Sequence, residues 1–286
     1  SGNYLYVAAP GIGALSVVNV VTDTVVANIT VIVSPTDVLY DPLTNRLYVV
    51  EPGAIYIVNP NNNEVVEKVE MPVSISIGPG ITYNSENGYL YAVGCSIYMN
   101  YTMNYSYNYS YIYIINPVNF SIVGRIEVSP AILGGTGIAY DPRNGYLYIT
   151  SYFSNEVYVV NPANGDIVAT IKVGSGPTGI AYDPENGYIY VAVTGSNVLS
   201  VIDPANNSVI ANITFELPPY LAIMLHPYGV TYDPQTGYLY VTTGLSGITY
   251  FYVSPDNVYV FVVNPANKSI IGNFSVGLGP SGITYD

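Results

Sequence analysis

Residues 176–192 read GPTGIAYDPENGYIYVA, and the stretch just before them, residues 158–174, reads YVVNPANGDIVATIKVG. Each stretch holds two short runs of Tyr, Val and Ile, residues that favour β-strands, on either side of a turn. In the turns DPENG and NPANG, Pro fixes φ at the first corner and Asn-Gly accepts positive φ at the close. The two stretches therefore predict two β-hairpins, which supply four short strands.

The same unit recurs along the whole chain. The acid or amide that closes its first strand falls at six anchor positions spaced 42 to 57 residues apart: Asp41, Asn84, Asp141, Asp183, Asp233 and Asp286. A four-stranded unit repeated at about this period is typical of a β-propeller blade. We call its strands a to d in chain order. Alternation within each strand has the period of two that a sheet requires.

The two ends of the chain complement each other. Residues 279–286, GPSGITYD, are a strand a with nothing after it, and residues 1–11, SGNYLYVAAPG, open on a strand b. Propellers close their ring by joining such ends, which removes free sheet edges. We therefore expect an all-β protein, a single six-bladed β-propeller domain of four-stranded antiparallel blades over residues 1–286. Its closing blade is 1–31 plus 282–286, and the others are 36–70, 80–127, 137–172, 179–214 and 229–275.

The wording of the repeat resembles the YVTN β-propeller family, known from archaeal surface-layer and cell-surface proteins. The resemblance is carried by residues 158–174 and 176–192 and extends over essentially the whole chain. It implies a propeller fold and a place outside the cell. Known members have seven blades, so a count of six departs from the family and leaves open a further blade outside this chain.

Composition excludes several classes of protein. The net charge is -13, which repels phosphate backbones and argues against nucleic-acid binding. Half of the residues are hydrophobic, yet no apolar run reaches the length of about 18 residues that a membrane-spanning helix needs. Cys95 is the only cysteine, so no internal disulfide forms, and a small apolar role is expected for it. The chain starts at Ser1 without Met, so we expect that any export signal has already been removed.

Nine N-x-S/T sequons occur, each of which needs an exported, exposed Asn to carry a sugar. They are Asn28, Asn100, Asn104, Asn108, Asn119, Asn206, Asn212, Asn267 and Asn273. The alternative is polar turn and edge residues with accidental spacing. Three sequons fall within a Tyr/Asn tract at 100–113, a composition prone to β-aggregation, and sugars there would oppose aggregation.

The long connections all fall between strands d and a or between strands b and c, which open on one face of a propeller. Loops on one face of a rigid scaffold usually carry binding. These loops are rich in Tyr and aliphatic residues, which suit contact surfaces. The candidate contact residues are Tyr101, Tyr105, Tyr107, Tyr220, Leu221, Met224, Tyr228, Tyr250 and Tyr252. The alternative is that the loops pack on one another over the top of the ring.

Catalytic constellations are missing from the sequence. His226 is the only histidine, which excludes histidine-based metal sites and leaves it a structural role before Pro227. Acids such as Asp141 and Asp183 sit in turns, where Asp caps its own backbone. Strand a offers Thr36, Thr136, Thr178 and Ser281, with Asp37 as its one acid at the channel end. Lactonase-like six-bladed propellers hold a divalent metal with channel-facing Glu, Asn and Asp, and that set cannot be assembled here. No catalytic residue, metal or cofactor is expected.

These observations favour a non-enzymatic extracellular protein. The first hypothesis is a component of an archaeal surface layer, sheath or filament, or an adhesin, at the cell surface of a thermophile. Its partners would be other copies of itself or other surface proteins, with glycans as a further option. The alternative is a glycan- or protein-binding module that uses the Tyr-rich face, and a lactonase- or lyase-like enzyme is third. Strand a of one subunit could also complete the ring of the next and build a fibre.

Overall fold

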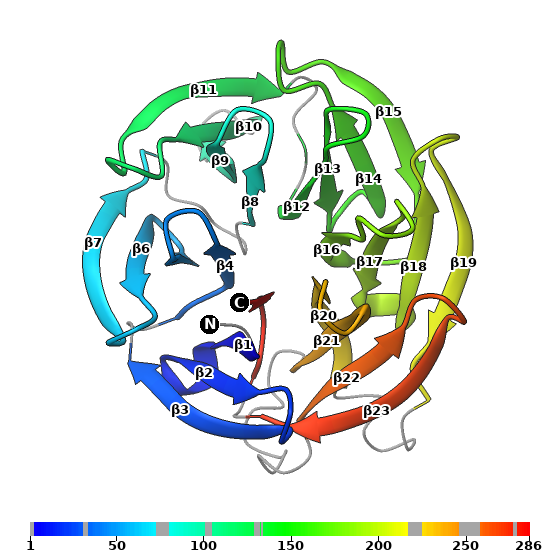
Figure 1. Ribbon diagram of the computed structural model, residues 1–286. Coiled ribbons are helices and arrows are strands. Elements are labelled where there is room, and N and C mark those ends of the chain that lie inside the picture. The colour runs from blue at the N-terminus through cyan, green and yellow to red at the C-terminus, as the bar shows by residue number, and fades with distance from the viewer. Residues whose placement is uncertain are drawn as a thin grey trace.

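The structure, a computed structural model, describes residues 3–30, 34–72, 80–100, 105–128, 132, 134–216, 225–245, 258–276 and 279–286. Side chains are described for the same residues except 95–100, 105–109 and 245. Six four-stranded antiparallel sheets stand around a central axis (Figure 1). This confirms the predicted six-bladed β-propeller. No helix among the described residues is long and apolar enough to cross a membrane.

Strands a, b, c and d follow one another from the axis to the rim in every blade (Figure 1). Blade 1 consists of β24 (Ile283–Tyr285), β1 (Tyr4–Ala9), β2 (Ala14–Asn19) and β3 (Thr24–Thr30). Blade 2 consists of β4 (Asp37–Asp41), β5 (Arg46–Glu51), β6 (Ala54–Asn59) and β7 (Glu64–Glu70). Blade 3 consists of β8 (Ile81–Asn84), β9 (Tyr89–Asn100), β10 (Tyr105–Ile115) and β11 (Ile122–Val128).

The second half of the ring repeats this arrangement. Blade 4 consists of β12 (Gly135–Asp141), β13 (Tyr146–Ser151), β14 (Glu156–Val160) and β15 (Ile167–Lys172). Blade 5 consists of β16 (Pro177–Tyr182), β17 (Ile189–Val193), β18 (Val198–Asp203) and β19 (Ser208–Thr214). Blade 6 consists of β20 (Leu225–Asp233), β21 (Tyr238–Leu245), β22 (Tyr259–Asn264) and β23 (Ser269–Ser275). Two short 3-10 helices, Pro10–Ile12 and Thr194–Ser196, occupy connections between strands b and c.

The turns form as their sequences predict. In blade 4, the Gly145 amide donates to the Asp141 carbonyl at 2.9 Å, and Gly145 has φ +77. A residue with a side chain adopts such a φ only at a cost, so Asn-Gly fits this corner. At the c–d turn, Gly165 has φ +80 and donates to Asn161 in the same way. These tight turns close the a–b and c–d hairpins of blade 4.

The hydrophobic core lies between the blades. Six clusters of buried side chains occupy the six junctions of the ring, and each draws residues from two neighbouring blades. Between blades 1 and 2, for example, Leu15 and Leu47 are fully buried. A blade therefore buries its faces only with both neighbours present, which couples the stability of the six units.

The ring closes within one chain. Leu5 of β1 pairs with Tyr285 of β24, and the Asp286 amide donates to the Tyr4 carbonyl at 3.0 Å. At the other end of the pairing, the Ser281 amide donates to the Ala8 carbonyl at 2.8 Å. The predicted junction of the two chain ends is confirmed, and the two ends lie beside each other near the axis (Figure 1).

Every outer strand carries a β-bulge at the same place. The register between strands c and d shifts by one residue in all six blades, which leaves one residue of strand d unpaired. These bulged residues are Val26, Val66, Val123, Val168, Ile210 and Ile271, and they are 39% to 53% exposed. A bulge bends a strand and interrupts its edge.

Candidate functional site

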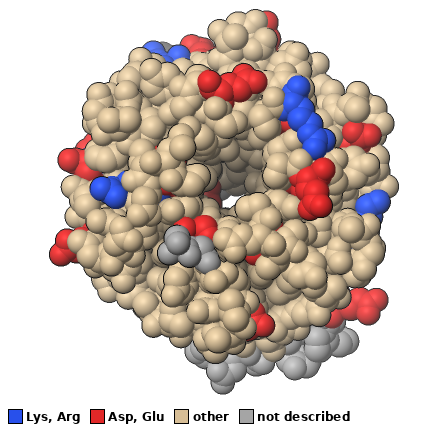
Figure 2. All heavy atoms as spheres, viewed as in Figure 1, with Lys and Arg blue, Asp and Glu red and all other residues tan. Residues whose placement is uncertain are grey.

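The inner strands enclose a cavity of about 460 Å³ on the axis of the ring. Figure 2 shows it opening at the centre of the molecule. Strand a of every blade contributes to the wall, which is made of Thr, Gly, aliphatic and Tyr residues. Among the described lining residues, Asp37 is the only one with a charged side chain. The cavity is thus a mostly uncharged channel with one carboxylate on its wall.

Small residues let neighbouring a strands approach closely around the channel. A Cβ atom on Gly137 would lie 2.5 Å from the carbonyl oxygen of Thr178 in the next blade. Hydroxyls near these glycines also bond across the junctions: Thr178 Oγ1 donates to the Tyr228 carbonyl at 2.8 Å, and Ser281 Oγ to the Pro35 carbonyl at 3.2 Å. These strand-a hydroxyls join blades, so their role is structural.

Asp37 replaces a glycine of the repeat. The equivalent residues in the other blades are Gly80, Gly137, Gly179, Gly229 and Gly282. Asp37 Oδ1 accepts a hydrogen bond from the Val38 amide at 2.9 Å, and Oδ2 accepts one from the Ile81 amide of blade 3 at 3.1 Å. Burial raises the pKa of Asp37 to about 7, against the opposite effect of these two amides. The carboxyl group therefore changes charge near neutral pH.

The donor set in the channel does not suit the divalent metal of lactonase-like propellers. Such a hard cation prefers several carboxylate and carbonyl oxygens. Asp37 is the one carboxylate on the described wall, and each of its oxygens already accepts a backbone amide. No group of three His, Cys, Asp or Glu residues with metal-binding geometry occurs in the described part of the chain.

A ring of tyrosines from strand a lines the channel on the side of the a–b turns. The members found on the cavity wall are Tyr40, Tyr83, Tyr140, Tyr182 and Tyr232. Tyr232 Oη donates to Glu185 Oε2 of the preceding blade at 2.9 Å. Burial, and then the neighbouring Asp286, raises the pKa of Tyr40 to about 12. These phenols stay protonated at neutral pH. Tyr232 thereby joins blades 5 and 6, whereas Tyr40 Oη donates to Asn45 Oδ1 of its own blade at 3.1 Å.

The acids of the a–b turns are buried backbone caps. Asp141 and Asp183 each accept the amide two residues further on at 2.9 Å. Both are about 1% exposed, and burial raises the pKa of each. Asp41 and Asp233 make the same contact. His226 lies within strand β20 opposite Gly244 and is half-buried.

Most of the predicted contact residues fall outside the described residues. This holds for Tyr101, Tyr220, Leu221, Met224, Tyr250 and Tyr252. Tyr105 and Tyr107 lie in strand β10, whose residues 105 to 110 pair with residues 95 to 100 of β9, so this part of the expected loop is a hairpin. Tyr228 is half-buried and lines the channel.

One exposed aromatic pair lies outside the long loops that the sequence pattern indicates. Tyr152 and Phe153, in the b–c connection of blade 4, are 39% and 54% exposed and pack edge to face at 5.4 Å between ring centroids. Gly134 and Gly176, both with positive φ, lie against these rings. Blade 5 has Thr194–Ser196 at the same place, so two aromatics in this turn were the available signal. The pair lies in a connection between strands b and c, on the face of the ring opposite the a–b and c–d turns.

The six sequon asparagines with described side chains are all exposed. They are Asn28, Asn119, Asn206, Asn212, Asn267 and Asn273. In the c–d turns, the hydroxyl two residues on donates to the Asn Oδ1 atom, at 2.6 Å for Asn206 and 2.7 Å for Asn267. The amide nitrogen, which is the atom that carries a sugar, takes no part in these bonds. Asn100, Asn104 and Asn108 lie outside the described side chains.

Comparisons with known proteins agree on the fold. A sequence model described as Arylesterase matches residues 75–213, just under half of the chain. No curated protein matches the sequence. Among solved structures, a protein of unknown function from Bacteroides caccae is similar with a TM-score of 0.75 and 13% identity, covering 100% of this chain and 99% of that one.

Two further structures host the same fold in different settings. A chain of a nidogen/laminin complex has a TM-score of 0.68 and 15% identity, covering 99% of this chain and 97% of its own. A chain of Kuenenia stuttgartiensis hydrazine synthase has a TM-score of 0.61 and 17% identity, covering 94% and 82%. At such identities the likeness shows the propeller fold alone, because one fold serves many functions.

Proposed function

We propose that this chain is a non-enzymatic protein of the cell exterior, part of a surface layer, sheath or filament, or an adhesin. The observation that carries the proposal is the difference between the two faces of the ring. One face holds only tight a–b and c–d turns, and the other holds all of the longer connections. Binding sites on propellers and barrels are built from such loops on a rigid scaffold.

The surface and the channel support the same proposal. Charged residues make up 9% of the chain, and Figure 2 shows them scattered singly or in small groups among uncharged ones. The exposed pair Tyr152 and Phe153 gives the long-loop face an apolar contact point. Six exposed sequon asparagines suit an exported glycoprotein. The single channel carboxylate, held by two backbone amides, offers little for catalysis.

The test is assembly of the native protein at the cell surface. Electron microscopy with a specific antibody is expected to find it in a repeating array or filament outside the cell. Alanine at Tyr152 and Phe153, or at Tyr220 and Tyr252, should raise the protein concentration needed for assembly at least tenfold. Leu43, 77% exposed on the tight-turn face, supplies the control, since Leu43→Ala should assemble normally. A protein found inside the cell, or assembly unaffected by all of these changes, contradicts the proposal.

A second candidate is a module that binds a glycan or a single protein through the same face. It is favoured by the similarity to a chain from a protein–protein complex, nidogen/laminin. A stable monomer that binds an isolated partner, with binding lost in Tyr152→Ala/Phe153→Ala, would favour this function over an array.

A third candidate is a hydrolase, favoured by the arylesterase match over residues 75–213 and by the raised pKa of Asp37. Assays with aryl esters and lactones decide it. Turnover that disappears in Asp37→Asn would establish the hydrolase and displace the first proposal.

A further inference from the structure

The outermost strand of each blade is a free sheet edge. Strands β3, β7, β11, β15, β19 and β23 stand at the ends of their sheets and form the rim of the ring (Figure 1). A free edge presents unpaired amides and carbonyls that can pair with another chain, so proteins protect such edges with bulges or charges. The six outer strands can therefore be compared by how the edge of each one is protected.

The bulge protects only the first part of each outer strand. From the residue after the bulge onward, the strand runs in regular register with strand c. We call the residue two places after the bulge the edge position, since it is exposed in all six blades. The edge positions are Asn28, Lys68, Arg125, Thr170, Asn212 and Asn273.

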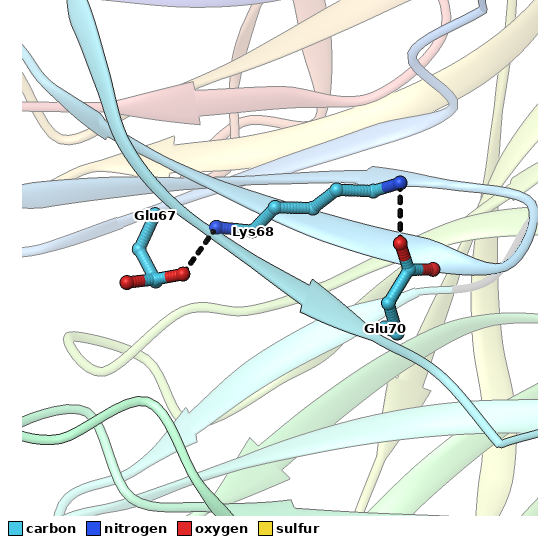
Figure 3. Close-up of polar contacts among 3 residues, drawn as sticks. All are labelled: Glu67, Lys68 and Glu70. Carbon is cyan, nitrogen blue, oxygen red and sulfur yellow. Dashed lines mark hydrogen bonds and ion pairs between the residues drawn. The ribbon is translucent and has the colours of Figure 1, made fainter.

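Three outer strands carry charges on this regular part. In β7, Lys68 bonds to Glu70 Oε1 at 2.6 Å, and its amide donates to Glu67 Oε1 at 3.1 Å (Figure 3). In β11, the Arg125 guanidinium lies 4.7 Å from the ring centroid of Tyr111. In β15, the edge position is Thr170 and the exposed charge is Lys172, two residues further on. A new strand could pair with these edges only by burying those charges.

The other three outer strands contain no charged residue. They read TVVANIT in β3, SVIANIT in β19 and SIIGNFS in β23. Such uncharged, β-branched segments without Pro are prone to pair with other strands. At the edge position each has an exposed Asn that begins a sequon: Asn28, Asn212 and Asn273. Sequons therefore occur on all of the uncharged outer strands and on none of the charged ones.

The local geometry suits modification at Asn28 and Asn212 in particular. Ser16 Oγ donates to Asn28 Oδ1 at 2.9 Å, and Ser200 Oγ donates to Asn212 Oδ1 at 2.7 Å. Each bond fixes the oxygen of the side-chain amide against strand c. The amide nitrogen takes no part in these bonds. Both asparagine side chains are exposed at the rim of the ring.

We propose that Asn28, Asn212 and Asn273 carry N-linked glycans, and that these glycans protect the edges of blades 1, 5 and 6 as charges protect blades 2, 3 and 4. The proposal rests on the extracellular location proposed above. In the modification, an Asn Nδ2 exchanges one hydrogen, released as a proton, for the anomeric carbon of a sugar. An activated glycosyl diphosphate donates the sugar, and its diphosphate leaves with the electron pair. The bulky, hydrated sugar then prevents strand addition at the edge.

The first measurement is glycopeptide mass spectrometry of the native protein. Sugar at all three edge asparagines supports the proposal. Sugar at the turn sequons Asn119, Asn206 and Asn267 with bare edge asparagines overturns it while leaving the extracellular location intact. Bare asparagines at every sequon overturn it as well, and the extracellular location is then decided by the electron microscopy described above.

The second measurement compares two variants that each lose three glycans, both made in an exporting, glycosylating host. Thr30→Ala/Thr214→Ala/Ser275→Ala destroys the edge sequons and keeps their asparagines. Ser121→Ala/Ser208→Ala/Ser269→Ala does the same at the turns. Sedimentation is expected to show dimers and larger species for the edge variant at concentrations at least tenfold below those at which the turn variant associates.

A third variant separates association from misfolding. Asn28→Lys/Asn212→Lys/Asn273→Lys also lacks the edge glycans but places a positive charge at each of the three edge positions. In sedimentation it is expected to associate no more than the unsubstituted, glycosylated protein. Its circular dichroism spectrum should be the same as that of the unsubstituted protein. Equal association of the edge and turn variants, or association of the lysine variant to the same extent as the edge variant, overturns the proposal.

Discussion

At the scale of single residues, Asp37 is the clearest departure from the repeat. Five blades place glycine at its position, because the neighbouring strand a passes too close for a side chain. Between blades 2 and 3 the carboxylate is accommodated and accepts the Ile81 amide across the junction. It is a polar link between two blades as well as the only charge on the described channel wall.

The stability of the protein should therefore depend on the charge of Asp37. The pKa of Asp37 is about 7 in the folded protein, against about 3.9 for an ordinary unfolded Asp. Between these values the folded state holds a proton that the unfolded state has lost. The free energy of unfolding should fall as pH rises from 4 to 7, by on the order of a few kcal/mol, and level off above 7.

Thermal unfolding across pH 4 to 8 measures this effect. In Asp37→Asn the free energy of unfolding should fall less as pH rises, since Asn stays neutral. Asp141 and Asp183 still contribute a smaller dependence on pH of the same sign. The exposed Asp23→Asn serves as the control and should keep the full slope. An unchanged slope in Asp37→Asn would contradict the assignment.

Glycine at the inner junctions gives a second prediction. Gly137→Ala would place a Cβ 2.5 Å from the Thr178 carbonyl, so it should lower the free energy of unfolding by about 1 to 3 kcal/mol through overpacking. Gly272→Ala in outer strand β23 meets no atom within 4 Å and should be neutral or slightly stabilising. Chemical denaturation of the two variants decides, and equal effects would show that close approach is not the reason for glycine at position 137.

At the scale of strands and hairpins, the sequence predicts the fold well because the same four-stranded pattern recurs in every blade. The turns DPENG and NPANG identify both hairpins, and the matching ends locate the closing strand. What it could not predict is where strands of different blades meet. The contact from Asp37 to Ile81 joins residues of two blades, and nothing in either local pattern indicates it.

The register of the outer strands is a second feature that the sequence hides. The extra residue at each bulge changes which positions face outward, so Asn28 and Lys68 emerge as equivalent only once the pairing is known. The exposed pair Tyr152 and Phe153 lies in a short connection, whereas the sequence pattern points to the long Tyr-rich connections as the contact surface.

At the scale of the whole molecule, stability depends on closure of the ring. Removing residues 282–286 would delete β24, expose the inner edge of β1 and lose the buried Ile283. The lost burial and hydrogen bonds amount to on the order of 5 kcal/mol. By calorimetry we expect the melting temperature to fall by about 10 to 20 °C.

Adding the missing strand as a separate peptide should restore stability to the truncated protein. A peptide of residues 279–286, GPSGITYD, should bind the truncated protein and restore part of the lost melting temperature, while a scrambled peptide should not. A truncated protein that melts like the full chain would show that the closing strand is dispensable.

The position of the two ends has a consequence for how the ring can be attached. Asn3 and Asp286 flank the place where blade 1 would have its a–b turn, so both ends leave from the face of tight turns. A tether fused to either end would hold that face toward the support. The long-loop face would then point away from the anchor with the channel axis upright, and the six rims would stand sideways toward neighbouring molecules.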